Sequence, residues 1–229
     1  VTMAQGTLID ASATQNGDGG TVVLWSDIKN PDSVTTAQGE ILAKGGENGG
    51  NGGQIETSGA MIDNAGVIVS AEALSGKGGE WLIDPYNYNI DADAASAIAN
   101  TLNRGTSVTI WTVSNVLAYG SNAISTSPGD ITVKSSILKT TGGDATLTLR
   151  AHRRVFVWNG REIKSTAGKL NIVLWSDYDN NDDAGVSLLG NLTTNGGHVW
   201  IGGSPTNEGS LKWNGLIVGD DSSAGGSGA

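Results

Sequence analysis

The sequence predicts an all-β fold, a solenoid of short repeated strands, and three observations carry this prediction. Glycine supplies 35 of the 229 residues and proline only 4, and many of the glycines form GG pairs that separate strands. Short windows alternate apolar and polar side chains with a period of two. The phrase GGTVVLWSD at 19–27 returns as KLNIVLWSD at 169–177. A repeated strand that cannot bury its own apolar face must stack on its neighbours.

A β-sandwich built of similar hairpins is the alternative fold. Hairpins favour two-residue Asn-Gly or Asp-Gly turns, whereas the connections in this sequence are longer and uneven. The solenoid is therefore the preferred prediction.

Strand-like windows follow one another at intervals of mostly about 10 to 20 residues, bounded by Gly, Asn, Asp and Ser. They are 21–25, 54–57, 67–70, 80–83, 107–111, 130–134, 145–149, 155–158, 170–175, 186–189, 198–201 and 216–218.

The phrase WLIDP at 81–85 predicts a corner. We expect Leu82 to fill the core, Pro85 to end the strand because it cannot donate a ladder hydrogen bond, and Asp84 to accept from turn amides. The phrase would mark the point where the regular repeat changes and a helix begins.

Residues 93–104 predict that one helical excursion. They are rich in alanine, place apolar residues at helical spacing, begin at Asp93 and end at Gly105. We expect this helix to pack on the outside of the solenoid. The remaining organisation is a single solenoid segment over 1–219, interpreted as internal to a longer protein, and a flexible Gly/Ser-rich end at 220–229.

Five phrases in order resemble a known family: GQIETSG at 53–59, WLIDP at 81–85, the helix, SVTIW at 107–111 and GDITV at 129–133. In this respect the chain resembles the filamentous-haemagglutinin-like large exoproteins of two-partner secretion. The resemblance covers about residues 19 to 203. It implies a right-handed parallel β-helix, export by an outer-membrane partner transporter that engages an upstream domain, and a location outside the cell or on the bacterial surface.

Composition narrows the range of functions. A net charge of −10 argues against a nucleic-acid partner, which needs a basic surface. The absence of cysteine excludes disulfides and thiolate zinc sites within this sequence. We expect no membrane insertion, because no window of the sequence has the required apolar length.

Outward-facing tryptophans are the main candidates for ligand binding. If Ile172 and Leu174 point inward, the alternation places Trp175 outside, and exposed aromatic rings often mark contacts such as sugar stacking. Packing under loops or a neighbouring chain is the competing interpretation. The tryptophan candidates are Trp25, Trp111, Trp158, Trp175 and Trp200.

A basic run from residue 150 to 164 is the second candidate for ligand binding, with Arg153 and Arg154 at its centre. It could hold an anionic glycan, or it could form a solvated face and pair with a nearby Asp.

A calcium site is the third candidate, with Asp177, Asp179, Asn181 and Asp183 as ligands. These residues mimic the first half of a calcium loop, but the glycine and the bidentate acid of that loop are missing. A solvated corner rich in Asp and Asn is the alternative.

We predict a rigid rod that presents a binding surface to a host-cell receptor or glycan, with no catalysis and no resident cofactor. Two alternatives stay open: a purely structural stalk, and a polysaccharide-active β-helix enzyme. The enzyme needs converging carboxylates, and the polygalacturonase-like phrases in this sequence occur in the wrong order.

Overall fold

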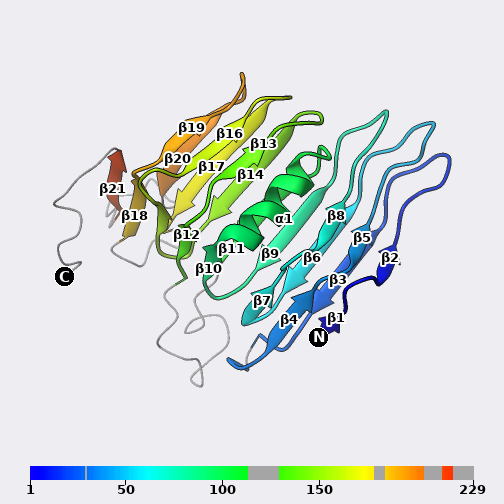
Figure 1. Ribbon diagram of the computed structural model, residues 1–229, viewed down its shortest axis with the longest axis horizontal. Helices are drawn as coiled ribbons and strands as arrows, with labels where there is room; N and C mark the ends of the chain where they lie inside the picture. Colours follow the sequence, from blue (N-terminus) through cyan, green and yellow to red (C-terminus); the bar gives the residue numbers. More distant parts are fainter. Residues whose placement is uncertain (29, 113–128, 178–183, 204–212, 219–229) are drawn as a thin grey trace.

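The computed structural model describes residues 1–28, 30–112, 129–177, 184–203 and 213–218, and this part of the chain is mostly β (Figure 1). Every pair of named strands is parallel. The coarse prediction of an all-β fold with parallel strands is therefore confirmed. The predicted end at 220–229 lies outside the described residues.

One seven-stranded sheet, here called the long sheet, runs through the described structure in the order β20-β17-β14-β11-β9-β6-β3. Its strands are β3 (Thr21–Trp25), β6 (Gln54–Ser58), β9 (Glu80–Asp84), β11 (Ser107–Trp111), β14 (Ala145–Arg150), β17 (Leu170–Ser176) and β20 (Val199–Gly203).

Four shorter sheets accompany the long sheet. Two form one side: β1 (Thr2–Met3), β4 (Val34–Ala37) and β7 (Met61–Asp63), then β10 (Tyr88–Ile90), β12 (Ile131–Val133), β15 (Val155–Val157), β18 (Ala184–Leu188) and β21 (Trp213–Val218). Two form another side: β2 (Leu8–Asp10), β5 (Glu40–Leu42) and β8 (Ile68–Ser70), then β13 (Ile137–Lys139), β16 (Glu162–Ser165) and β19 (Asn191–Thr193).

Successive strands along the chain enter the three sides in turn, so that β4, β5 and β6 form one layer and β7, β8 and β9 the next. In these layers each strand pairs with the strand at the same position in the following layer. The repeated glycine-and-strand phrases of the sequence correspond to the strands of the long sheet, because each layer must present the same apolar face to the same core.

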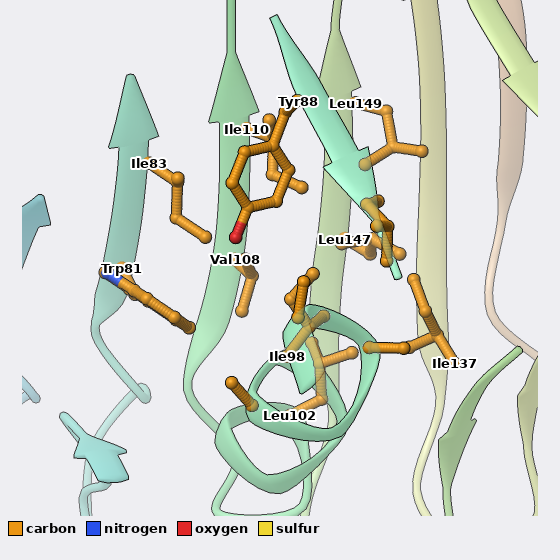
Figure 2. Packing of buried hydrophobic residues seen from close by; sticks show 14 of the residues in the cluster. Trp81, Ile83, Tyr88, Ile98, Leu102, Val108, Ile110, Ile137, Leu147 and Leu149 are labelled. Atoms are coloured by element: carbon orange, nitrogen blue, oxygen red, sulfur yellow. The ribbon is translucent and has the colours of Figure 1, made fainter. Parts of the chain in front are cut away.

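The core lies between the sides and is built from inward side chains paired across the long sheet. One inward row contains Ile55, Trp81, Val108, Leu147 and Ile172, all at most 1% exposed. Figure 2 shows part of this row facing the residues of the helix and of β13.

The inward position in β9 belongs to Trp81 and Ile83, whereas Leu82 lies on the outer face. The expectation that Leu82 fills the core is therefore wrong. Leu82 shares the phase of the charged residues Glu80 and Asp84, whereas Trp81 and Ile83 form the wholly apolar phase that faces the core. Trp81 reaches Thr57, a buried residue of the neighbouring strand, and donates a 3.2 Å hydrogen bond from Nε1 to Oγ1, which satisfies its one polar atom.

The helix α1 (Ala92–Leu102) takes the position of a strand between β8 and β13. Its Ile98 and Leu102 are fully buried in the main core (Figure 2). The expectation that the helix packs outside the solenoid is thus wrong, because its apolar face replaces strand side chains in the core. The N-cap is Asp91, whose Oδ1 accepts from the Ala94 amide at 3.1 Å, and Asp93 lies in the first turn.

The break in the two shorter sides follows directly after Asp84 and Pro85. Strand β9 ends at Asp84, β10 starts a new sheet rather than extending β7, and α1 separates β8 from β13. The long sheet alone continues through this layer in the described residues. Across the same described ranges, no helix combines the length and apolar character needed to span a membrane.

All twelve sequence windows coincide with strands, within a few residues at each end. The additional strands have two to four residues each and lie between polar turns, so they carry too few alternations to be recognised. They are β1, β2, β4, β5, β7, β10, β13, β16 and β19.

Candidate functional site

The outer face of the long sheet carries a row of side chains that we call the outer row. The register of the sheet aligns one position from each strand. Trp25 pairs with Ser58, and Ser58 pairs with Asp84. Ile110 pairs with Ile83, which places the next residue, Trp111, opposite Asp84. The complete outer row is Trp25, Ser58, Asp84, Trp111, Arg150, Trp175 and Gly202.

Arg150 lies between two tryptophans of this row. Its guanidinium carbon is 4.0 Å from the ring centroid of Trp111 and 4.6 Å from that of Trp175. Strands of a sheet lie about 4.8 Å apart, so side chains at paired positions of three adjacent strands stack face to face. The planar guanidinium suits this position better than an ammonium, because it can stack on both indole faces.

Trp200 extends the stack by one ring. Its indole contacts Trp175 edge-on, with centroids 5.6 Å apart and planes at 70°. The ring also lies close to Gly202, where an added Cβ would be 2.8 Å from an indole carbon. Glycine at that position therefore leaves space for the indole. We call Trp111, Arg150, Trp175 and Trp200 the aromatic stack.

The sequence-predicted tryptophans do not all belong to the aromatic stack. Trp25 is 59% exposed at the far end of the outer row, with Ser58 and Asp84 between it and Trp111. Trp158 follows β15 on another side, is 39% exposed, and has the Lys134 ammonium 5.5 Å from its ring centroid. The five candidates thus form one group of three and two separate positions.

The two basic candidates lie at the corner after β14. Arg153 forms a two-pronged ion pair with Asp130, from Nε to Oδ1 at 2.8 Å and from Nη2 to Oδ2 at 2.5 Å. This geometry is the alternative that the sequence left open, in which the basic run pairs with a nearby Asp. Arg154 is half-buried, and its carbonyl accepts from the Ile131 amide at 2.9 Å.

Of the calcium candidates, Asp177 alone belongs to the described residues. It is fully buried, its backbone has a φ of 48°, and its amide donates to the Arg153 carbonyl at 2.9 Å. Asp179, Asn181 and Asp183 lie outside the described residues, so the calcium site stays a prediction. Within the described ranges, no cluster of three or more His, Asp or Glu residues could hold a metal ion.

Asp84 is the carboxylate of the outer row. Burial raises its pKa from 3.8 to about 7, and the nearby negative charge of Glu56 contributes to the same shift. Ser58 donates to Glu56 Oε1 at 2.6 Å, while Asp84 Oδ1 is buried with no hydrogen-bond partner among the described residues. We expected turn amides to donate hydrogen bonds to the Asp84 carboxylate, but its Oδ1 accepts none from the described residues. An acid in this environment favours its protonated form near neutral pH.

Lys139 is a buried charge that the sequence analysis did not single out. The side chain is fully buried, and its ammonium donates to the carbonyls of Thr141, Gly142 and Ala167 at 2.6, 3.2 and 2.5 Å. Burial lowers the pKa of this lysine. The signal in the sequence is the phrase ILK at 137–139, in which alternation gives Lys139 the same inward phase as Ile137.

No family model matches the chain, and no curated protein is similar enough to it to count as a match. The resemblance to the exoprotein family therefore stays a prediction that rests on the quoted phrases.

Proposed function

We propose that the chain is a right-handed parallel β-helical segment of a secreted bacterial exoprotein of the filamentous-haemagglutinin-like kind. The order of the sheets supports this proposal, because a chain that enters three sides in turn and pairs each strand with the next layer builds a rod. In the proposed setting an outer-membrane partner transporter exports the protein through an upstream domain, and the rod is displayed on the cell surface or released.

We further propose that this rod is an adhesin whose outer face binds a glycan of a host cell. The aromatic stack is the observation that carries this part of the proposal. Three indoles and one guanidinium lie in contact on one face of the long sheet, and Trp200 is 47% exposed. Aromatic rings stack on the apolar faces of sugar rings, and large exposed aromatics on soluble proteins usually mark contacts.

The stack is suited to binding because its geometry is fixed before a ligand arrives. Trp111, Arg150 and Trp175 extend from three hydrogen-bonded strands, and Trp200 rests on the backbone of Gly202. Side chains that are already ordered lose little conformational entropy on binding, which raises the affinity available from a small contact area.

The test is binding of the purified chain to a broad glycan panel, compared with a Trp175→Ala, Trp200→Ala variant. We expect saturable binding that this variant loses. Trp158→Ala is the matched control, because Trp158 is an exposed tryptophan on a different side. If the folded chain binds no glycan on the panel, the purely structural stalk is favoured. If Trp158→Ala loses as much glycan binding as the Trp175→Ala, Trp200→Ala variant, the aromatic stack is not the binding site.

A further inference from the structure

A pocket of about 580 Å³ lies at the edge of the long sheet where its strands begin. It arises because neighbouring connecting segments differ in length. The segment 71–79 leads into β9 and is longer than 103–106 and 140–144, which lead into β11 and β14. Figure 1 shows the longer loops ahead of β6 and β9 projecting past the end of α1. The long segment thus forms a wall, and the shorter ones form a floor.

Two glycines of the pocket lining let the backbones of neighbouring layers approach closely. A Cβ added at Gly78 would lie 1.9 Å from the Gly105 carbonyl oxygen, and one at Gly142 would lie 2.1 Å from the Asn103 carbonyl oxygen. Both distances are far inside van der Waals contact, so glycine is required at both positions. The volume falls within the range of typical small-molecule sites.

Four charged residues line the pocket, two acids and two cations. Glu72 forms a 2.6 Å ion pair with Lys44, and Asp144 Oδ1 accepts from the Lys169 amide at 2.8 Å. The two cations, Lys77 and Arg104, have no acidic partner within the described residues.

Arg104 donates from Nη1 to the Asn100 carbonyl at 2.9 Å, at the carboxyl end of α1. This contact anchors the guanidinium and leaves most of its five donors available. The pocket therefore offers a ligand two cations that lack an acidic partner within the described residues, beside the Asp144 carboxylate, whose hydrogen-bond partner is a neutral amide.

The floor offers neutral hydrogen-bond donors. Ser107 Oγ accepts from the Thr146 amide at 3.1 Å, and Thr146 Oγ1 accepts from Asn171 Nδ2 at 3.3 Å. In these hydrogen bonds both hydroxyls act as acceptors, so each retains a proton to donate. Two cations beside a row of hydroxyls match a ligand that carries one acidic group and several hydroxyl groups.

We propose that this pocket binds a carboxylated saccharide, with the carboxylate held by Lys77 and Arg104 and the sugar hydroxyls on Ser107 and Thr146. The pocket is separate from the aromatic stack, and it rests on the proposed function only in the choice of a saccharide as ligand. It gives the rod a second site, one that selects for acidic sugars.

The test is calorimetric titration of the chain with trigalacturonate, with maltotriose as the neutral counterpart and inorganic sulfate as a simple anion. We expect trigalacturonate alone to bind, with a Kd that rises with salt concentration. A Lys77→Gln, Arg104→Gln variant should bind at least about tenfold more weakly. Lys164→Gln, a half-buried lysine of β16 that does not line the pocket, is the control.

Three results would overturn the inference: no binding of trigalacturonate, equal binding of maltotriose or sulfate, or unchanged affinity in the double variant. The variant of the aromatic stack separates the two proposals. If Trp175→Ala, Trp200→Ala loses trigalacturonate and the Lys77, Arg104 variant does not, the stack is the site and the pocket is not. If the reverse holds, the pocket stands without the stack.

Discussion

Replacing Asp84 by asparagine should stabilise the protein at neutral and alkaline pH and have little effect near pH 4. The folded state holds a proton on Asp84 up to about pH 7, because burial and the charge of Glu56 disfavour the carboxylate. The unfolded state releases that proton near the ordinary pKa of 3.8. Folding stability therefore falls as pH rises from about 4 to about 7, where the folded state binds more protons than the unfolded state.

The size of this effect follows from the two pKa values. One pKa unit corresponds to about 1.4 kcal/mol, so the difference between 3.8 and about 7 amounts to at most about 4 kcal/mol. An asparagine side chain in place of Asp84 has nearly the same shape and no proton to release. The variant should therefore keep above pH 7 the stability that the wild type loses.

The assay is urea unfolding of wild type and Asp84→Asn at pH 4.5 and pH 8, followed by tryptophan fluorescence. Other titrating groups are common to both proteins and cancel in the difference between them. We expect the difference in unfolding free energy, variant minus wild type, to rise by roughly 2 to 4 kcal/mol from pH 4.5 to pH 8. A second variant, Glu56→Gln, removes the neighbouring charge and should recover a smaller part of the same gain. A difference that is equal at both pH values would refute the reasoning.

Three further predictions concern stability and can be measured by the same unfolding experiment. Lys139→Met should lower the free energy of unfolding by roughly 2 kcal/mol, because it removes the charged donor that three carbonyls of the following turns share; a loss under about 1 kcal/mol would contradict this role. Gly78→Ala should lower the free energy of unfolding by about 3 kcal/mol or prevent folding. Gly143→Ala should be nearly neutral, because the space at its Cβ position is open. Equal effects of the two variants would contradict the close backbone approach at Gly78. Asp91→Ala should lower the free energy of unfolding by about 1 kcal/mol, because it removes the N-cap of α1. An unchanged urea midpoint would show that Asp91 does not cap the helix.

The sequence was sufficient to predict the strands that make the long sheet. Strands such as β17, with seven residues in strict alternation, carry enough pattern to give both their position and their inward phase. In β9 the charged residues Glu80 and Asp84 share the phase of Leu82, so the alternation itself indicates that Trp81 and Ile83 face inward. Most of the strands with two to four residues carry too little pattern to be recognised at all.

The candidate site was predictable in part. Alternation placed Trp175 on the outer face correctly, since Ile172 and Leu174 are fully buried. It could not show that Arg150 lies between two tryptophans, because residues 111, 150 and 175 come together only through the register of three strands. The place of α1 was unpredictable for the same reason, because its neighbours β8 and β13 are distant in sequence.

The layer that contains α1 has a mechanical consequence. A rod pulled along its axis bears load through the hydrogen bonds between its layers, in parallel on all three sides. At this layer the described structure keeps a continuous ladder only in the long sheet, while side-chain packing of α1 bridges β8 and β13. Side-chain packing resists separation less than a ladder of directional backbone hydrogen bonds that are loaded together. If the chain is the surface-displayed rod proposed above, shear flow should open it first beside the helix and leave the regular layers on either side intact.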